Sequence, residues 1–329
     1  MSILRGLAYD DVLLIPNYGN VSRDDGSVET SLGEHQFKIP LISANMDTIT
    51  GAEMAIAMAQ LGGLGILHRF MSNQENVTAY REAVDLLVDP SSVGVSVGVG
   101  ESEVVRAELL YMAGARLFCV DVAHAHCKMA GKMVKRLKLY SDTYVIAGNV
   151  ATYGGADYLV GCGADAVKVG VGAGSVCTTR EVTGFGVPQF TAITDCARID
   201  RPIIADGGIR TSGDAVKALA AGAAMVMLGG MLAGTDETQA LAKGLYRGMA
   251  SPEARKDYYG LDTGRAAEGI TIKVKPKGSV ADAIAEIIGG IKSGLSYAGA
   301  KDLNELRRKA VFMQVTQAAV KEGTPHGFR

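Results

Sequence analysis

The feature that most constrains the fold of this chain is a unit that recurs eight times. Short runs rich in β-branched residues start 23 to 28 residues apart, with one interval of 36, and Ala/Leu-rich stretches of helical period lie between them. Strands that are apolar on both faces and alternate with helices form parallel sheets covered by helices. Eight such units predict a closed (β/α)8 TIM barrel of the α/β class, a single domain over residues 1–329. The eight runs are residues 39–46, 64–69, 92–99, 116–123, 143–150, 166–172, 202–208 and 225–230.

An open, doubly wound sheet is the alternative architecture. It rests on Gly170-x-Gly172-x-Gly174, a partial dinucleotide-binding fingerprint. The residues that follow, from Ser175 onward, have no helical period, and no acidic residue closes the unit. Residues 170–188 are better explained as an extended loop after the sixth strand, which accounts for the interval of 36. Loops of that length in compact domains are usually functional.

The composition argues against several classes of function. Lys and Arg number 33 against 35 Asp and Glu, so the formal net charge of −2 offers no basic excess for nucleic acid or an anionic membrane. Aromatic residues make up 6% of the chain and Trp is absent, which supplies few stacking partners for bases. The N-terminus shows no signal-peptide pattern, and five cysteines without a CxxC pair suit the reducing cytoplasm. We therefore expect a cytoplasmic protein that acts on a small molecule.

In a TIM barrel the functional residues lie in the loops that follow the strands. Glycine pairs stand in two such loops, Gly207-Gly208 after the seventh strand and Gly229-Gly230 after the eighth, where barrels often bind phosphate through backbone N–H groups. Asp206, just before the first pair, has two acceptor oxygens that suit a ribose diol. A turn carboxylate that caps backbone N–H groups is the alternative for Asp206.

Cys177 is the candidate nucleophile. It lies in a Gly-rich, uncharged part of the 170–188 loop, and Arg180 and the backbone dipoles nearby favour the thiolate. A buried structural cysteine is the alternative. Lys168, on the sixth strand, is a rival candidate as a Schiff-base lysine, unless it pairs with a carboxylate at the barrel mouth. His124, with His126 and Cys127, lacks the second ligand pair of a zinc site and fits the pocket mouth or a solvated loop.

Residues 243–270, beyond the eighth strand, mix charge, Gly and Tyr in the manner of a mobile lid or flap. A lid excludes water from a reacting centre. Glu268 lies in this segment, within the sequence RAAEG. A surface glutamate in a solvated loop is the alternative interpretation.

Several motifs resemble the IMP dehydrogenase/GMP reductase family. The resemblance runs over nearly the whole chain, and the loop G-x-G-S-x-C-T-T-R, residues 172–180, is its most specific part. The motifs are residues 9–16 (YDDVLLIP), 44–48 (ANMDT), 147–150 (AGNV), 168–180, 206–208 (DGG), 227–234 (MLGGMLAG) and 246–249 (YRGM).

The resemblance implies that Cys177 attacks C2 of a purine nucleotide to form a covalent thioimidate, with Thr179 and Glu268 as a proton-handling pair. It also implies a homotetramer, a nicotinamide cofactor and a monovalent cation, which family precedent gives as K+. The implied substrate-binding residues are Ser175, Asp206, Gly207, Gly208, Gly229, Gly230, Tyr246, Gly248, Met249 and Arg265. The implied cofactor-binding residues are Arg69, Asp121, Val122, Ala123, Met249, Gly264, Arg265, Ser293 and Tyr297. The implied cation site consists of Gly172, Gly174, Cys177 and Arg180.

Two features favour the reductase within this family. The regulatory CBS pair that many dehydrogenases insert after the second strand is absent, because only residues 71–90 join strands two and three. The segment from Met249 to Glu268 is about twenty residues long and has no Arg-Tyr dipeptide, whereas a dehydrogenase flap is longer and uses that pair to activate water. The sequence thus predicts a GMP reductase that converts GMP to IMP and ammonia with NADPH, in purine salvage. An IMP dehydrogenase without CBS domains, which makes XMP from IMP with NAD, is the alternative.

Overall fold

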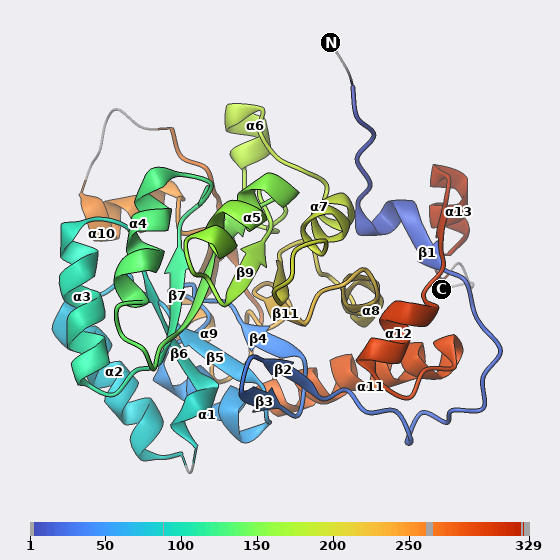
Figure 1. Ribbon diagram of the computed structural model, residues 1–329, viewed down its shortest axis with the longest axis horizontal. Coiled ribbons are helices and arrows are strands. Elements are labelled where there is room, and N and C mark those ends of the chain that lie inside the picture. The colour runs from blue at the N-terminus through green and yellow to red at the C-terminus, as the bar shows by residue number, and fades with distance from the viewer. Residues whose placement is uncertain (1–2, 88, 261–265, 324, 326–329) are drawn as a thin grey trace.

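The computed structural model describes residues 3–87, 89–260, 266–323 and 325. Eight parallel strands close into a barrel in which each strand pairs with the next along the chain and the last pairs with the first (Figure 1). The predicted TIM barrel is confirmed. Its strands are β4 (Leu41–Ser43), β5 (Leu64–Leu67), β6 (Val93–Val97), β7 (Leu117–Asp121), β8 (Tyr144–Val150), β9 (Ala166–Val169), β10 (Ile203–Asp206) and β11 (Met225–Leu228).

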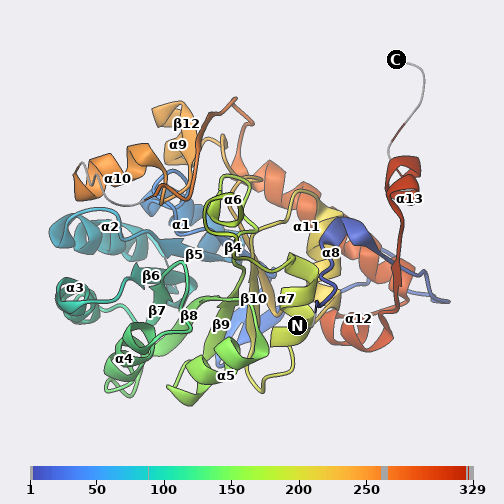
Figure 2. The ribbon, with the colours of Figure 1, turned by 90° about the horizontal axis from the view of Figure 1, so that it is seen from above.

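Helices surround the ring of strands when the molecule is viewed from above (Figure 2). Alternate strand residues face opposite ways, so that Leu41 packs in the core between strands and helices while Ile42 packs in the barrel interior. Both layers are apolar, which is why the strand segments read as continuous hydrophobic runs. The helices are α1 (Ala52–Gln60), α2 (Asn73–Asp85), α3 (Glu101–Met112), α4 (Lys128–Leu137), α5 (Tyr153–Gly161), α7 (Gln189–Cys196), α8 (Ser212–Ala220) and α11 (Val280–Ala298).

The connection between β5 and β6 carries no inserted domain within the described residues. It consists of α2 and a short 3-10 turn, η2 (Pro90–Ser92). Helix α2 begins with a capping box in which the Ser72 side chain accepts from the Glu75 amide and Glu75 accepts from the Ser72 amide. This sequence signal, S-x-x-E, marks the start of the helix between the second and third barrel strands.

The 170–188 segment lies where it was expected, between β9 and α7, but it is not extended throughout. Residues of this loop form the short helix α6 (Thr179–Thr183), which ends at Gly184 in the left-handed conformation. Helix α6 stands above the strands (Figures 1 and 2). The loop therefore presents its cysteine just before a helix, over the open end of the barrel.

Smaller elements complete the chain. A hairpin of β2 (Thr30–Leu32) and β3 (His35–Phe37) adds Leu32 and Phe37 to the inner core of the barrel. Segments η1 (Tyr9–Asp11) and β1 (Val12–Leu14) precede it, and β1 pairs with β14 (Phe312–Gln314). The 243–270 region contains β12 (Leu245–Arg247) and α10 (Pro252–Tyr259), and β12 pairs with β13 (Thr271–Lys273). The remaining helices are α9 (Gln239–Lys243), α12 (Leu303–Lys309) and α13 (Gln317–Glu322).

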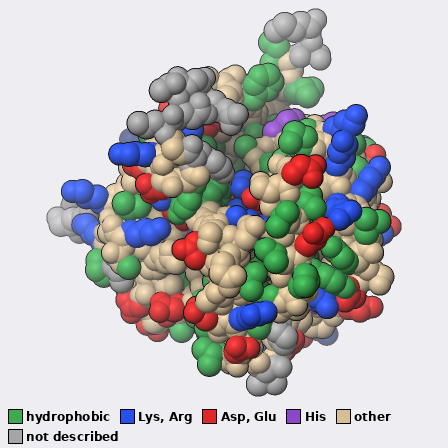
Figure 3. Space-filling view, turned by 90° about the vertical axis from the view of Figure 1, so that its left-hand side faces the viewer, with side chains coloured by type: hydrophobic (Ala, Val, Ile, Leu, Met, Phe, Trp, Pro, Cys, Tyr) green, Lys and Arg blue, Asp and Glu red, His purple; other side chains and the backbone are tan. Residues whose placement is uncertain are grey.

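The surface is mixed in character on the face that Figure 3 displays. Basic, acidic and apolar side chains are interspersed there, in keeping with the near balance of charges in the sequence. Over the described ranges, no helix combines the length and the apolar character that crossing a membrane requires.

Candidate active site

A cavity of about 1440 Å³ opens where the strands of the barrel end. Its walls are the loops after β4, β5, β7, β9, β10 and β11, together with Asn149 of β8, residues 8–10 and residues from the 243–270 region. Pockets for one small ligand commonly measure about 300–1000 Å³. This cavity has room for two ligands side by side.

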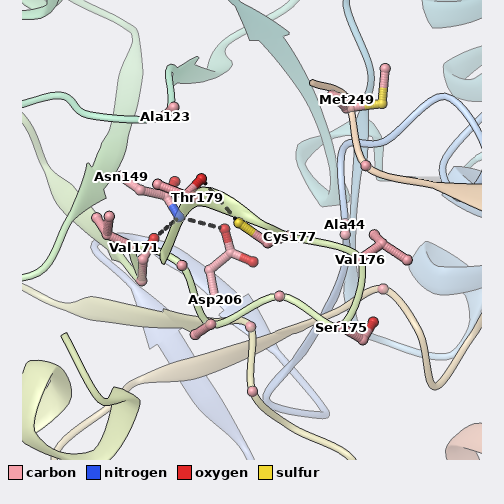
Figure 4. A pocket seen from close by; sticks show the side chains of 18 of the residues that line it. Ala44, Ala123, Asn149, Val171, Ser175, Val176, Cys177, Thr179, Asp206 and Met249 are labelled. Carbon is pink, nitrogen blue, oxygen red and sulfur yellow. Dashed lines mark hydrogen bonds between the residues drawn. The ribbon is translucent and has the colours of Figure 1, made fainter. Parts of the chain in front are cut away.

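Cys177, Thr179 and Glu268 form a hydrogen-bonded chain on one wall of the cavity. The Cys177 thiol donates to the Thr179 hydroxyl at 3.2 Å, and that hydroxyl donates to Glu268 Oε2 at 2.8 Å. All three side chains are half-buried and line the cavity. Figure 4 shows Cys177, Thr179 and Asp206 directed toward a common space. Such a chain can carry the thiol proton to a carboxylate, which leaves a nucleophilic sulfur.

The backbone joins the cysteine loop to the 243–270 region. Cys177 and Gly269 form an antiparallel bridge, and the Thr178 amide donates to the Glu268 carbonyl at 3.1 Å. The Glu268 amide in turn donates to the Ala250 carbonyl at 3.0 Å. The backbone of Glu268 is thus hydrogen-bonded to Thr178 and to Ala250, so Glu268 is not a free surface glutamate. Its side chain contacts Thr179, which is 89 residues away in the sequence.

A buried ion triad lies at the base of the cavity. The Lys168 ammonium, whose side chain is 3% exposed, lies 2.8 Å from Asp121 Oδ1 and 2.8 Å from Asp206 Oδ2. Asn149 accepts a hydrogen bond from Lys168 and donates one to Asp206 Oδ2 at 2.8 Å. Burial alone would lower the pKa of Lys168, but the two carboxylates outweigh it and hold this pKa above its ordinary value. A protonated amine has no lone pair for a Schiff base, so the ion-pair interpretation of Lys168 holds.

We expect Lys168→Met to lower the free energy of unfolding by about 3–5 kcal/mol, because two buried carboxylates would lose their counter-ion. Urea unfolding followed by circular dichroism measures this loss. Arg136→Met is the control, since Arg136 pairs with Glu108 on the surface and such pairs contribute less than about 1 kcal/mol. Equal losses for the two variants would contradict the prediction.

Glycines and hydroxyls form a cradle at another part of the cavity. A side chain at Gly229 would collide with the Tyr246 hydroxyl, and one at Gly230 would meet Ser175 Oγ at 2.9 Å. Burial raises the pKa of Tyr246 to about 12, so its hydroxyl stays a donor. Backbone N–H groups that no side chain shields, together with neutral donors, suit an anion such as a phosphate. Gly207, with φ +91°, adds a turn that only glycine adopts readily.

The predicted cofactor residues divide into three groups. Arg69, the 121–123 segment and Met249 line the cavity. Gly264 and Arg265 lie outside the described residues. Ser293 and Tyr297 lie on α11, which packs against α8 on the outside of the barrel, and neither lines the cavity of its own chain. Their assignment stays a prediction.

The donor set of the predicted cation site fits a hard monovalent cation. Gly172, Gly174 and Cys177 offer carbonyl oxygens within one tight loop, and the Cys177 amide closes the turn on the Gly174 carbonyl at 3.1 Å. The Arg180 side chain packs against Gly172 and Gly186 and donates to the Val187 carbonyl at 2.7 Å. Arg180 therefore fixes this loop through a side chain that has no acceptor for a metal.

The other metal candidate does not form a cluster. His124 and His126 are exposed and do not line the cavity, with ring centroids 6.3 Å apart. Among the residues that the structure describes, no three His, Cys, Asp or Glu side chains are grouped to hold a metal ion. The solvated-loop interpretation of His124 is the one that the geometry favours.

Sequence reasoning missed several residues at the cavity. Tyr9 from η1 and Gln189 from α7 border Gly208 and are almost fully buried, at 2% and 3% exposed. Asp47, just past β4, accepts hydrogen bonds from Arg247 and Tyr258 in the 243–270 region. Only the position of Asp47 after a strand pointed to it, because its partners lie about two hundred residues away in the chain.

Buried His68 predicts a pH dependence of stability. It is 3% exposed, and burial lowers its pKa to about 4. The unfolded histidine, with a pKa of about 6.5, binds a proton before the folded one does, so stability falls as pH drops below about 6.5. Between about pH 7 and pH 5 we expect a loss of about 2 kcal/mol from this group. Chemical denaturation at both pH values should show a smaller loss of stability in His68→Gln than in the wild type. The control, His124→Gln, should lose as much stability as the wild type. A wild-type loss in His68→Gln would refute the assignment.

Comparison with known proteins agrees with this geometry. The family model described as the IMP dehydrogenase / GMP reductase domain matches residues 6–326. The chain belongs to the IMP dehydrogenase/GMP reductase family and is an oxidoreductase of purine nucleotide metabolism, in a family that uses a nicotinamide cofactor.

Individual relatives carry the names of both branches of the family. A solved structure of a GMP reductase variant from Trypanosoma brucei, in complex with guanosine 5′-monophosphate, has a TM-score of 0.91 and 31% identity, and the match covers 100% of this chain and 99% of that one. The IMP dehydrogenase of Cryptosporidium parvum is 36% identical over 385 residues, covering 99% of this chain and 96% of the relative. That of Nitrosopumilus maritimus is 34% identical over 471 residues, covering 99% of each. Identities this similar do not distinguish the two activities.

Proposed function

We propose that this protein is a GMP reductase, which converts GMP and NADPH to IMP, ammonia and NADP. The observation that carries the proposal is the Cys177–Thr179–Glu268 chain of hydrogen bonds, combined with a segment of about twenty residues between Met249 and Glu268. The chain gives the site a proton path. The short segment lacks the Arg-Tyr pair with which a dehydrogenase prepares water.

In the proposed reaction the purine nucleotide lies with its phosphate in the Ser175–Tyr246 cradle and its ribose hydroxyls at Asp206. Cys177 Sγ bonds to C2 of GMP and the bond from C2 to the amino nitrogen breaks. The thiol proton passes through Thr179 to Glu268 and from there to the leaving nitrogen, so that ammonia departs and a thioimidate remains. This order uses both hydrogen bonds of the chain.

The second half of the reaction needs a hydride at C2, which NADPH supplies when bound. Val122, Ala123 and Met249 line the same cavity as Cys177 and add apolar surface to it, and the cavity volume accommodates a second ligand. When C2 receives the hydride, the bond to Cys177 Sγ breaks, IMP forms and the thiolate is regenerated. The carbonyls of Gly172, Gly174 and Cys177 would hold K+ and thereby stiffen the loop that carries the nucleophile. We further propose a homotetramer, the arrangement in which Ser293 or Tyr297 would reach a neighbouring copy's cavity.

Two parallel assays test the proposal at about 340 nm, where reduced nicotinamide absorbs. With GMP and NADPH we expect the absorbance to fall and IMP and ammonia to appear in equal amounts. With IMP, NAD and water we expect no sustained rise. The second candidate, IMP dehydrogenase, is favoured by the names of the sequence relatives. Steady XMP formation without oxidation of NADPH by GMP would establish it instead.

A further inference from the structure

The carboxylate of Asp47 lies at the centre of the contacts that hold the 243–270 region on the barrel. Asp47 is fully buried, and its Oδ2 atom accepts hydrogen bonds from Arg247 Nε at 3.0 Å, from Arg247 Nη2 and from the Tyr258 hydroxyl at 2.9 Å. The Lys243 ammonium lies 3.5 Å from the same oxygen. Asp47 Oδ2, in the loop after β4, thus contacts Lys243 at the end of α9, Arg247 of β12 and Tyr258 of α10.

The charge of Asp47 is needed because its main partner cannot lose its own. Arg247 is 4% exposed, and a guanidinium keeps its proton at any pH that proteins tolerate. Burial alone would raise the pKa of Asp47, but Arg247 and Lys243 outweigh it and keep this pKa below its ordinary value. Arg247 also pairs with Asp257, at 2.6 Å, but the Asp257 side chain is 53% exposed. A neutral side chain at position 47 would therefore remove the buried one of the two counter-ions of Arg247, and a cation that loses its buried counter-ion moves toward water.

Arg247 is connected to the reacting groups by a short run of backbone. Gly248 donates to the Ile270 carbonyl at 3.1 Å, and the Ala250 carbonyl accepts from the Glu268 amide at 3.0 Å. Met249, between them, accepts a hydrogen bond at its sulfur from the Asp47 amide at 3.4 Å. Displacement of Arg247 would therefore shift the strand that positions Glu268.

We propose that Asp47 is a positioning residue for the reaction, which holds Glu268 against Thr179 through Arg247 and Tyr258. Asp47 contacts no reacting atom. The role assigned to Glu268 rests on the proposed function, whereas the mechanical link from Asp47 to residues 247–260 does not.

The test uses Tyr258→Phe, which removes a single hydrogen bond, and Asp47→Asn, which removes the charge. We expect Tyr258→Phe to lower kcat about tenfold, because a tenfold change corresponds to the free energy of one hydrogen bond to a charged group. The KM for GMP should stay within about twofold of the wild-type value. Asp47→Asn should lower kcat further. Tyr18→Phe, at a tyrosine that is 98% exposed, is the matched control and should leave both constants unchanged. Should Asp47→Asn fail to fold, the Tyr258→Phe result decides alone.

Two further measurements separate positioning from a merely structural role. In a double-mutant cycle, Asp47→Asn should add almost nothing to the loss caused by Glu268→Gln, whereas losses that multiply would overturn the proposal. Amide hydrogen exchange should be faster in residues 248–259 of both single variants, and unchanged exchange would overturn it as well. If the wild-type enzyme does not reduce GMP, the proposed function fails while the exchange experiment still tests the link from Asp47.

Discussion

Cys177→Ala is expected to lower turnover of GMP by at least about ten-thousand-fold while its affinity for GMP stays within a few fold. Loss of a covalent nucleophile removes the pathway that it provides and not merely one contact. The groups that would hold the nucleotide, including Ser175, Tyr246 and Asp206, are untouched by the substitution. Steady-state NADPH oxidation measures turnover, and isothermal titration calorimetry measures affinity.

The control for this variant is Cys162→Ala, at a half-buried cysteine that does not line the cavity. It should retain nearly full activity. Intact-mass spectrometry after acid quenching should detect a nucleotide adduct on the wild-type enzyme and on Cys162→Ala, but not on Cys177→Ala. If Cys177→Ala kept more than about one hundredth of the wild-type turnover, the Cys177 sulfur would not be the nucleophile.

Glu268→Gln is expected to slow the release of ammonia about a thousand-fold and to slow hydride transfer much less. Glutamine can still accept a hydrogen bond from Thr179, but it cannot take up a proton, and general acid–base catalysis contributes about a hundred- to ten-thousand-fold. Ammonia release is measured by mixing GMP with the enzyme, quenching the reaction rapidly with acid and assaying the free ammonia. The burst of NADPH formed from IMP and NADP follows hydride transfer in the reverse direction, since it needs no ammonia.

Thr179→Val should reproduce this separation of the two steps, because it breaks the chain between Cys177 and Glu268 while keeping the size of the side chain. Glu181→Gln, an exposed glutamate on α6, is the matched control and should change neither step. If Glu268→Gln and Thr179→Val lost hydride transfer alone, the proton relay would be assigned to the wrong half of the reaction.

The barrel could be predicted from sequence because its strands are buried on both faces. All five residues of β6 are buried, for example, so no alternation interrupts the apolar run. The ends of strands were less accurate: residues 39–46 were expected as a strand that the structure limits to Leu41–Ser43. The apolar signal continues past the strand because the loop residues Ala44 and Asn45 are themselves buried.

The site could be predicted only where motif and position coincided. Cys177 and Asp206 follow strands and stand beside glycines, which sequence reveals. The partnership of Lys168 with two carboxylates depends on Asp206 of the neighbouring strand β10 and on Asp121 of β7, two strands away, and no local pattern encodes it. The same holds for Asp47 and Arg247, whose contact arises only when β12 returns to the loop after β4.

The bridge between Cys177 and Gly269 joins two separate parts of the chain. Cys177, Asp206 and the glycine turns belong to the barrel strands and the loops that follow them, whereas Tyr246 and Glu268 belong to the segment after the last barrel strand. In the proposed reaction, a change in the length of this segment would alter the step that follows adduct formation while the barrel itself stays intact.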